Sequence, residues 1–438
     1  MILLRVLLVV PPYLNEDRAL MGEMRLSTMP LGPTYIAAVL ELNGISVAIL
    51  DMSFPEIQNQ RLEDKLFELN PMVIGITSMS NNFQNATTIA KIVKQKNPRS
   101  IVVMGGVHPT FVHKEILKTI PEVDIVIRYE GEYSMTELVK ALDNETSLGK
   151  VKGISFRKEG TIISTPSREK IQDLDSLPYP AYHLLEPSVE KYLKHYGKRS
   201  FPVITTRGCP FNCIYCSTMA LHGRKYRTRS VSNVLGELSY LIKEYKVNEI
   251  SFVDDNFTMQ KDRVFSLCEE MKQRKLNLSW GCSARVDQVS KNLLEKMKEA
   301  GCTDIFFGIE SVSQKVLDLI KKGFTVQQAK DAIKTAEKLG IRTHCSFIIG
   351  LPGETVRSLN RIPKFVEETN PSGRVLPNLL DILPGTELFE KQEEYSIGSS
   401  FSFADVTKVQ LEMLLTFYKK TFKINKLFRV IPPNIVLE

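Results

Sequence analysis

The 438-residue sequence lacks several patterns that would define its class at once. No window reaches the ~18 apolar residues that a membrane-spanning helix needs, so no transmembrane segment is predicted. No G-x-G-x-x-G follows the first predicted strand, which leaves a dinucleotide site unsupported, and no G-x4-G-K-S/T phosphate loop occurs. The net charge is +7, but lysines and arginines are spread along the chain, so nucleic acid is not a predicted partner.

The apolar start of the chain lacks the marks of a signal peptide. It has no basic leader and no small-residue cleavage site, and it runs into Pro11 and Pro12. We interpret residues 5–10 as a buried parallel strand. The expectation is a cytoplasmic enzyme with reduced thiols.

Three of the seven cysteines lie in one short stretch. Cys209, Cys213 and Cys216 are spaced C-x3-C-x2-C. Thiolates select iron–sulfur clusters, zinc or Cu(I), and three of them on one loop can hold three corners of a four-iron cluster. A structural zinc site needs four ligands, yet no second C-x2-C or H-x3-5-H follows. On spacing alone, buried packing, zinc and a disulfide stay open beside a cluster.

The first third of the chain alternates short apolar runs with amphipathic stretches. This pattern predicts a doubly wound parallel sheet, whose ligands lie beyond the carboxyl ends of the strands. The residues at those ends are Pro11, Pro12, Asp51, Thr77, Ser78, Met79, Gly105, Gly106, His108, Glu130, Gly131 and Glu132. Glycines there allow close approach of the backbone to a ligand, and hydroxyls can hydrogen-bond it. A lone His108 is more often a hydrogen-bonded loop residue than a ligand.

The domain organisation predicted from these patterns has four parts. Residues 1–145 form the first α/β domain, and 146–198 form a proline-punctuated linker with a β-hairpin. Residues 199–395 repeat strand–helix units, which predicts a partial (β/α)6 barrel with its chemistry at the carboxyl ends of the strands. Residues 396–438 form a short helical extension.

Polar residues follow successive strands of the predicted barrel. They are Asp254, Asp255, Ser283, Arg285, Glu310, Gly350 and Glu354, beside the three clustered cysteines. Helix capping is the alternative for Asp254 and Asp255, and a surface ion pair with Asp287 is the alternative for Arg285.

Other chemistry-bearing residues are given structural roles. The isolated cysteines are predicted to be small core residues: Cys268, Cys282, Cys302 and Cys345. The basic run 223–229 is interpreted as a solvated face rather than a phosphate site.

The stretch 206–217 resembles the signature of the radical S-adenosylmethionine (SAM) superfamily. The resemblance implies that Cys209, Cys213 and Cys216 hold a [4Fe-4S] cluster whose open iron binds SAM, and that Tyr215 lies near the adenine. It also implies that Ser283, Arg285 and Glu310 hold the polar groups of SAM. Asp254 and Asp255 match the acidic turn of the family's "DDNF" segment.

The first third resembles the cobalamin-binding domain of B12-dependent radical SAM enzymes. The matching pieces are Pro11-Pro12, residues 29–40, residues 105–110 and residues 130–132. The resemblance implies cobalamin contacts at Pro11, Pro12, Thr77, Ser78, Gly105, Gly106, Glu130, Gly131 and Glu132. Ser53 stands where the D-x-H-x-x-G motif of other B12 domains has its cobalt-binding histidine, so that motif supplies no lower ligand.

The function that the resemblance implies is that of a cobalamin-dependent radical SAM methyltransferase. Such an enzyme methylates an unactivated carbon or phosphorus centre of a small-molecule or lipid substrate. It takes electrons from an external one-electron reductant of the ferredoxin or flavodoxin type. The alternatives are a B12-dependent cyclase or oxidoreductase without methyl transfer, and a non-catalytic iron–sulfur or B12 sensor.

Overall fold

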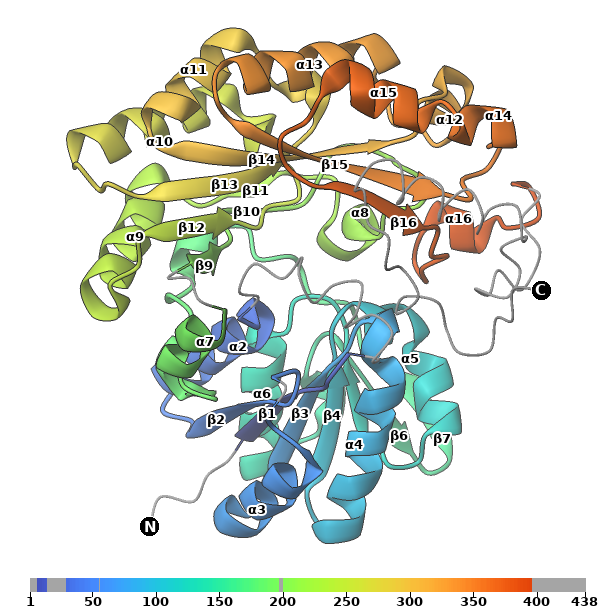
Figure 1. Ribbon diagram of the computed structural model, residues 1–438. Helices are drawn as coiled ribbons and strands as arrows, with labels where there is room; N and C mark the ends of the chain where they lie inside the picture. The colour runs from blue at the N-terminus through green and yellow to red at the C-terminus, as the bar shows by residue number, and fades with distance from the viewer. Residues whose placement is uncertain (1–5, 14–28, 55, 197–199, 396–438) are drawn as a thin grey trace. The chain divides into compact units, whose positions relative to one another are not determined.

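The computed structural model describes residues 6–13, 29–54, 56–196 and 200–395 (Figure 1). The chain forms two compact units, Met1–Lys198 and Arg199–Glu438. The helical extension predicted for 396–438 lies outside the described residues. Among the helices that are described, none is long and apolar enough to cross a membrane.

The first unit is built on one mixed sheet in the order β7-β6-β5-β4-β3-β1-β2-β8. Five parallel strands form its centre: β1 (Val6–Val10), β2 (Val47–Asp51), β3 (Val73–Thr77), β4 (Ile101–Gly105) and β5 (Ile125–Ile127). The segment predicted as a linker adds the antiparallel hairpin of β6 (Ile154–Lys158) and β7 (Thr161–Ser164) at one edge, and β8 (Leu185–Glu186) at the other. The predicted domain boundaries stay a prediction.

Helices connect these strands, as a doubly wound sheet requires. They are α2 (Leu31–Leu42), α3 (Asn59–Leu69), α4 (Phe83–Lys96), α5 (Val107–Thr119) and α6 (Glu132–Asp143), with α7 (Val189–Tyr196) after β8. Helix α2 packs against α6, and α3 packs against α4. The α/β prediction for this part of the chain is confirmed.

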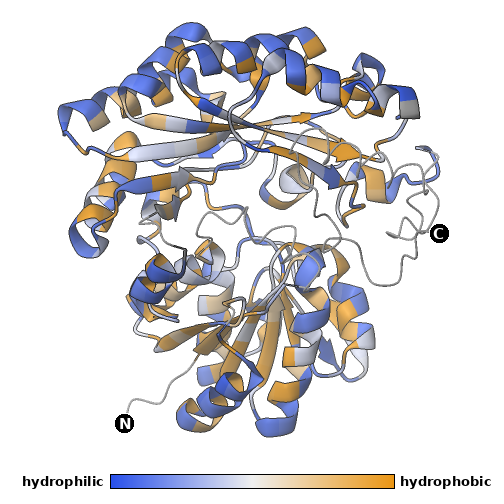
Figure 2. Cartoon of the chain, viewed as in Figure 1, coloured by the Kyte–Doolittle hydropathy of each residue, from blue (hydrophilic) through white to orange (hydrophobic). Residues whose placement is uncertain are grey.

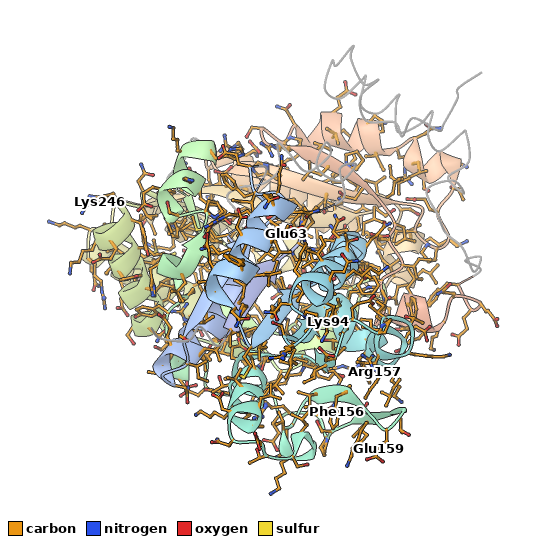
Figure 3. The ribbon with its side chains drawn as sticks, turned by 90° about the horizontal axis from the view of Figure 1, so that it is seen from below. Glu63, Lys94, Phe156, Arg157, Glu159 and Lys246 are labelled. Carbon is orange, nitrogen blue, oxygen red and sulfur yellow. The ribbon has the colours of Figure 1, made fainter. Side chains whose placement is uncertain are left out.

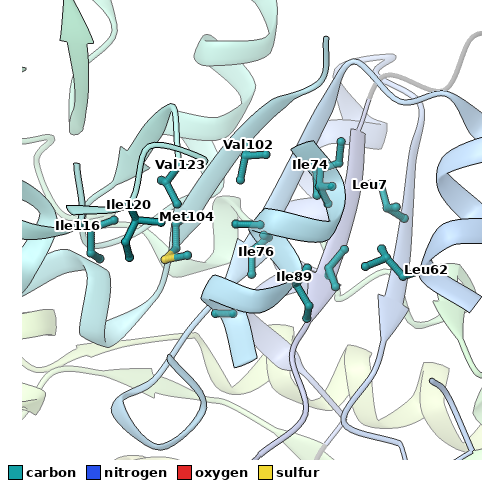
Figure 4. Close-up of a cluster of buried hydrophobic side chains, with 14 of the residues drawn as sticks. Leu7, Leu62, Ile74, Ile76, Ile89, Val102, Met104, Ile116, Ile120 and Val123 are labelled. Atoms are coloured by element: carbon teal, nitrogen blue, oxygen red, sulfur yellow. The ribbon is translucent and has the colours of Figure 1, made fainter. Parts of the chain in front are cut away.

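A hydrophobic core lies between this sheet and helices α3, α4 and α5. Alternate residues of each strand point into it, such as Ile74 and Ile76 of β3 or Val102 and Met104 of β4, because side chains alternate between the faces of a strand (Figure 4). Figure 2 shows these central strands as the most hydrophobic part of the unit, with hydrophilic residues on the helices that cover them. Burial of this apolar surface holds the strands in register.

Arg157 fastens the added hairpin to the rest of the unit. Its guanidinium donates hydrogen bonds to the carbonyl oxygens of Leu117 at 2.7 Å, Pro121 at 2.8 Å and Val123 at 2.5 Å. The Leu117 carbonyl belongs to the last turn of α5, and Pro121 and Val123 follow that helix. Backbone acceptors at a helix end have no intrahelical donor, and a cation is favoured there. Figure 3 shows Arg157 beside Phe156 on the hairpin.

The second unit is built on an open, all-parallel sheet in the order β16-β15-β14-β13-β12-β9. The strands are β9 (Ser200–Val203), β12 (Glu249–Phe252), β13 (Ser279–Ala284), β14 (Cys302–Glu310), β15 (Arg342–Ile349) and β16 (Val375–Leu379). The helices that alternate with them are α9 (Val231–Tyr245), α10 (Lys261–Gln273), α11 (Lys291–Glu299), α13 (Val326–Lys338) and α15 (Ile362–Thr369). Six parallel strands without closure match the predicted partial barrel.

Side-chain caps begin three of these helices. Ser230, Ser290 and Thr325 accept hydrogen bonds from the backbone N–H groups at the starts of α9, α11 and α13. A separate two-stranded ribbon, β10 (Thr206–Arg207) and β11 (Arg227–Thr228), lies on either side of the cysteine loop in the sequence. It therefore ties the two ends of that loop together.

Truncation of one side chain in the core of the first unit should lower stability measurably. Ile74 is fully buried, so we expect Ile74→Ala to reduce the free energy of unfolding by about 2–4 kcal/mol, from lost burial and the cavity left behind. The control is Phe67→Ala on α3, where the side chain is 91% exposed and about 0.5 kcal/mol or less is expected. Equal losses in urea unfolding would contradict the described core.

Candidate active site

One cavity of about 370 Å3 lies within the second unit at the carboxyl ends of its strands. It is lined by the cysteine loop, by residues that follow β12, by residues within or just after β13, β14 and β15, and by Lys322. The predicted barrel-site residues from Cys209 to Glu310 all line it, whereas Gly350 and Glu354 do not. Its size suits a small organic ligand. The roles of the individual residues stay predictions.

The three clustered thiols are half-buried and unpaired by disulfides. Burial raises the pKa of the Cys209 thiol to about 11, and burial likewise raises the pKa of Cys216. Without a metal, the Cys209 and Cys216 thiols therefore hold their protons, and loading with metal would release those protons. Within the described ranges, no three or more Cys, His, Asp or Glu side chains are arranged so that they could hold a single metal ion.

Arg285 is held against the cysteine loop. Its guanidinium lies over the ring of Phe211 at 3.6 Å and approaches Cys213 Sγ at 3.9 Å. Both carboxylate oxygens of Asp287 accept hydrogen bonds from it at 3.0 Å. The ion pair considered as an alternative thus exists, but it is buried rather than on the surface, with 8% of the Arg285 side chain exposed. The pair fixes the guanidinium at the cavity wall.

A buried acid–base pair, Glu310 and Lys322, also lines the cavity. Glu310 Oε1 accepts a hydrogen bond from Lys322 Nζ at 2.9 Å, and the same Nζ lies 2.9 Å from the Tyr215 hydroxyl. Glu310 has a φ of +66° at a bulge between β14 and β15, a conformation that non-glycine residues adopt rarely. Burial raises the pKa of Tyr215 well above its usual value, with Glu310 adding to the shift. The phenol is therefore neutral.

Lys322 is the one charged residue of the cavity lining that the sequence did not reveal. It lies in the turn after α12 (Gln314–Leu319), between Lys321, which is exposed, and Gly323. No periodicity or motif separates the two lysines, and only the fold shows that Lys322 is 6% exposed and paired with Glu310. Together these two side chains offer an anion and a cation to one ligand, which suits an α-amino acid moiety.

The two aspartates predicted as cofactor contacts have different surroundings. Asp254 is 1% exposed, and its carboxylate accepts hydrogen bonds from Thr205 and Thr206 just before the cysteine loop. Asp255 is exposed and accepts a hydrogen bond from Thr218 Oγ1 at 3.1 Å. Ser283 is half-buried at the cavity wall. Asp255 and Ser283 are thus open to a ligand.

The basic run 223–229 is divided by the fold. Arg227 and Arg229 are 3% and 4% exposed, and Arg229 forms an ion pair with the fully buried Glu237. The prediction of a solvated face is wrong for these two residues, because β11 pairs with β10 and brings them inside. Arg224 and Lys225 are exposed, as predicted. The four isolated cysteines are buried, which confirms their predicted place in the core.

The strand ends of the first unit form its predicted ligand edge. Pairing of β1 with β2 and of β3 with β4 brings Val10 beside Asp51 and Thr77 beside Gly105. Thr77, Gly105, Gly106 and Gly131 are half-buried, and Met79 is 40% exposed. These residues are open to a ligand at the edge.

Several residues predicted to contact a ligand at this edge form hydrogen bonds or close packing contacts with other residues of the protein. Ser78 is fully buried; its N–H donates to Gly105 O at 2.8 Å. Glu130 accepts a hydrogen bond from the Ile171 N–H at 2.7 Å. A Cβ on Gly106, whose φ is +105°, would lie 2.5 Å from Ser78 O, so the glycine is needed for backbone packing rather than for a ligand alone.

Asp51 and His108 also have partners inside the unit. The Asp51 carboxylate accepts hydrogen bonds from the Ser53 N–H at 2.8 Å and from the Tyr192 hydroxyl. His108 Nδ1 lies 2.9 Å from Ser80 Oγ, and its ring lies tilted against Phe83 with the ring centroids 4.4 Å apart. Burial lowers the pKa of His108, so its imidazole is neutral. His108 is thus hydrogen-bonded, as the sequence analysis favoured, but it lies in the first turn of α5 rather than in a loop.

The fold and the cavity define the class: an α/β protein with a three-cysteine loop beside a buried acid–base pair at the edge of a parallel sheet. The Radical SAM superfamily model matches residues 203–366, and the B12 binding domain model matches residues 18–139. The uncharacterized methyltransferase PH0819 of Pyrococcus horikoshii is 35% identical over 97% of this chain and 91% of its own length. The chain belongs to the radical SAM superfamily, in the branch with a B12-binding domain. The predicted family and fold class are confirmed.

Other relatives carry different activities. The cytidylyl-2-hydroxyethylphosphonate methyltransferase of Streptomyces wedmorensis is 31% identical over 78% of this chain and 73% of its own. The anaerobic magnesium-protoporphyrin IX monomethyl ester cyclase of Rubrivivax gelatinosus is 30% identical over 84% of this chain and 66% of its own. Among solved structures, the radical SAM methyltransferase TsrM of Kitasatospora setae, with cobalamin and a [4Fe-4S] cluster bound, has a TM-score of 0.74 at 16% identity, over 89% of this chain and 75% of its own. This last likeness shows the fold.

A titratable carboxyl outside the cavity gives the site unit a pH dependence. Glu354 follows β15 and accepts a hydrogen bond from the Gly350 N–H at 2.7 Å, while burial raises its pKa to about 7. Because the folded chain holds this proton more tightly than the unfolded one, the contribution of Glu354 to stability falls as the pH rises from about 4.5 to about 7.

Replacement of this carboxyl by an amide should remove that dependence. We expect the free energy of unfolding of Glu354→Gln, measured relative to the parent chain, to be about 1–3 kcal/mol higher at pH 8 than at pH 5. Urea unfolding of the metal-free protein at both pH values measures the difference. If the difference in unfolding free energy between the variant and the parent chain is the same at pH 5 and at pH 8, the raised pKa of Glu354 is contradicted.

Proposed function

We propose that the chain is a cobalamin-dependent radical SAM methyltransferase that acts in the cytoplasm. It methylates an unactivated carbon or phosphorus centre of a small-molecule or lipid substrate. The proposal rests on one observation: Cys209, Cys213 and Cys216 line the same cavity as the ion pair of Glu310 and Lys322. Similarity to two methyltransferases over most of the chain supports methyl transfer.

The second unit holds the cluster and SAM. The three thiols would ligate three irons, and the wall between Arg285 and Lys322 would hold SAM. Glu310 would accept hydrogen bonds from the ammonium of SAM, and Lys322 would donate to its carboxylate. Asp255 and Ser283 would hold its remaining polar groups. When bound, the cluster, SAM and cobalamin supply the electron-transfer and methyl-transfer chemistry.

The paired charges of this cavity also prepare it for binding. Glu310 and Lys322 are each less than a tenth exposed, so the removal of either partner would leave a buried charge uncompensated. Because the pair is already desolvated and positioned, a zwitterionic ligand meets donors and acceptors that need no reorganisation. Tyr215 and Phe211 add aromatic surface, which excludes water from the same wall.

The first unit would hold cobalamin at the carboxyl edge of its sheet. Met79 exposes an apolar side chain there, and large apolar groups at a ligand edge suit the apolar face of a corrin ring. Thr77, Gly105 and Gly131 are open for contact, whereas Ser78 and Glu130 act by holding the edge in shape. Pro11, Pro12, Gly106 and Glu132 complete the proposed contact set.

A cyclase or oxidoreductase without methyl transfer is the second candidate. It is favoured by the similarity to the magnesium-protoporphyrin ester cyclase, which covers most of this chain. The cavity residues serve either reaction, because both begin with SAM and the cluster. The fate of the methyl group of SAM separates the two.

A labelling experiment tests the function. Full-length protein, reconstituted anaerobically, is incubated with methyl-labelled SAM and a chemical reductant, and 5′-deoxyadenosine and the label are followed. We expect 5′-deoxyadenosine even without substrate, and label retained on cobalamin or on product. Cys216→Ala should lose at least about a hundredfold of this activity because a cluster ligand is gone, whereas Cys268→Ala in the core should keep it.

The outcomes of that experiment are distinct. No 5′-deoxyadenosine from the parent chain would refute the radical SAM chemistry. 5′-Deoxyadenosine with no transfer of label to cobalamin or product would favour the second candidate. Equal turnover by the parent chain and Cys216→Ala would refute the cluster.

We also propose where the external reductant docks. Arg224 and Lys225 are exposed and follow Gly223, whose carbonyl accepts a hydrogen bond from the Cys209 N–H at 3.3 Å. This turn thus touches the backbone that holds the proposed cluster. Two exposed cations there would steer an acidic ferredoxin or flavodoxin toward it.

Charge reversal at this turn should slow reduction by an acidic protein but not by a small reagent. We expect Arg224→Glu/Lys225→Glu to lower the rate of cluster reduction by reduced flavodoxin about tenfold at low salt, with the gap closing as salt is added. Dithionite should reduce both proteins equally. The control is Lys291→Glu/Lys364→Glu, which reverses two exposed cations on other helices. An equal effect of the two double variants would place the docking surface elsewhere.

A further inference from the structure

The turn after β12 contains a buried carboxylate that accepts four hydrogen bonds from its own chain. Asp254 Oδ1 accepts hydrogen bonds from the N–H groups of Thr205 and Thr206 and from Thr206 Oγ1, and Oδ2 accepts one from Thr205 Oγ1 at 3.0 Å. A carboxylate offers about four lone-pair sites. All four donors belong to two consecutive residues, and Oδ1, which accepts three of the four bonds, has no acceptor capacity left for a ligand.

The same turn reaches other parts of the cavity wall. The Asn256 carbonyl accepts a hydrogen bond from the Tyr226 hydroxyl at 2.8 Å, and its Oδ1 accepts one from the Arg285 N–H at 3.4 Å. Arg263 of α10 donates to the carbonyls of Thr205 and Arg229. The backbone at both ends of the cysteine loop is therefore tied to β12 and α10.

Thr205 and Thr206 lie directly before the loop that carries the clustered thiols. Cys209 follows Thr206 by three residues, and Gly208 between them has a φ of +97° and packs against the carbonyl of Lys225. The start of the loop is thus a sharp, crowded turn whose direction depends on where Thr206 is held. A fully buried carboxylate with four donors is a rigid anchor, because moving it would strand a charge away from water.

We infer that Asp254 is a positioning residue that fixes the start of the cysteine loop and does not contact SAM. The inference rests on the proposed function, since it concerns the residues that would ligate the cluster. It divides the acidic turn: Asp254 anchors the loop, and the exposed Asp255 faces the ligand. The prediction that both aspartates bind a cofactor is replaced by this division of roles.

The rate of iron release tests whether Asp254 fixes the start of the cysteine loop. Full-length protein is reconstituted anaerobically, and the loss of iron to a ferrous chelator is timed. We expect Asp254→Ala and Thr206→Val to release iron about tenfold and about threefold faster than the parent chain, because each removes bonds at the anchor. Asp254→Asn should stay within about twofold, since an amide oxygen still accepts the backbone N–H bonds.

Thr343→Val is the matched control. Thr343 is also fully buried and also donates its hydroxyl to a carboxylate, that of Glu337, but it lies near the start of β15, away from the cysteine loop. A merely structural role for Thr206 would make the two valine variants alike. We expect Thr343→Val to release iron at the parent rate, even if both variants lose thermal stability.

SAM binding to the same preparations separates anchoring from direct contact. We expect Asp254→Asn to bind SAM within about twofold of the parent affinity, because no carboxylate–ammonium contact is lost. A loss of tenfold or more in SAM affinity, with iron release at the parent rate in Asp254→Ala and Thr206→Val, would overturn the inference. Failure of the parent chain itself to take up iron would instead refute the proposed function.

Discussion

Parallel strands deliver their carboxyl ends to one edge of a sheet, and the cavity of the second unit depends on this constraint. Residues more than a hundred positions apart, such as Tyr215 and Lys322, become neighbours because β12, β13, β14 and β15 run in the same direction. The bulge that gives Glu310 its left-handed conformation turns one carboxylate out of the strand and into the cavity. The hydrogen-bond ladder thus sets where the polar groups meet.

Three of the five charged residues that line the cavity belong to ion pairs with little exposed surface: Glu310 pairs with Lys322, and Arg285 pairs with Asp287. Arg229 and Glu237 form a further buried pair outside the cavity lining. Such pairs add little net stability to the fold, yet the loss of one partner is costly because it leaves a buried charge uncompensated. The Cys209 and Cys216 thiols differ from these groups, because burial raises their pKa and keeps them protonated until a metal takes the place of the proton.

The parts of this site that the sequence predicts are those with a local signature. The spacing of Cys209, Cys213 and Cys216 is read within eight residues, and polar residues after apolar runs mark the strand ends. Lys322 has no such signature, because it looks like its exposed neighbour Lys321 until the chain folds around Glu310.

The same limit applies at other charged positions. Arg227 and Arg229 read as part of a solvated basic run, and only the ribbon of β10 and β11 reveals that they are buried. Asp254 and Asp255 are adjacent and chemically identical, and their different surroundings depend on which one Thr205 and Thr206 reach. Sequence alone gives no means to separate them.

Metal and cofactor analysis of anaerobically purified protein tests the central claim most directly. The account predicts about four irons and four acid-labile sulfides per chain, with one cobalt where cobalamin is supplied, and a broad thiolate-to-iron absorption that is lost in Cys216→Ala. Zinc in place of iron, or iron content and absorption unchanged in Cys216→Ala, would contradict it.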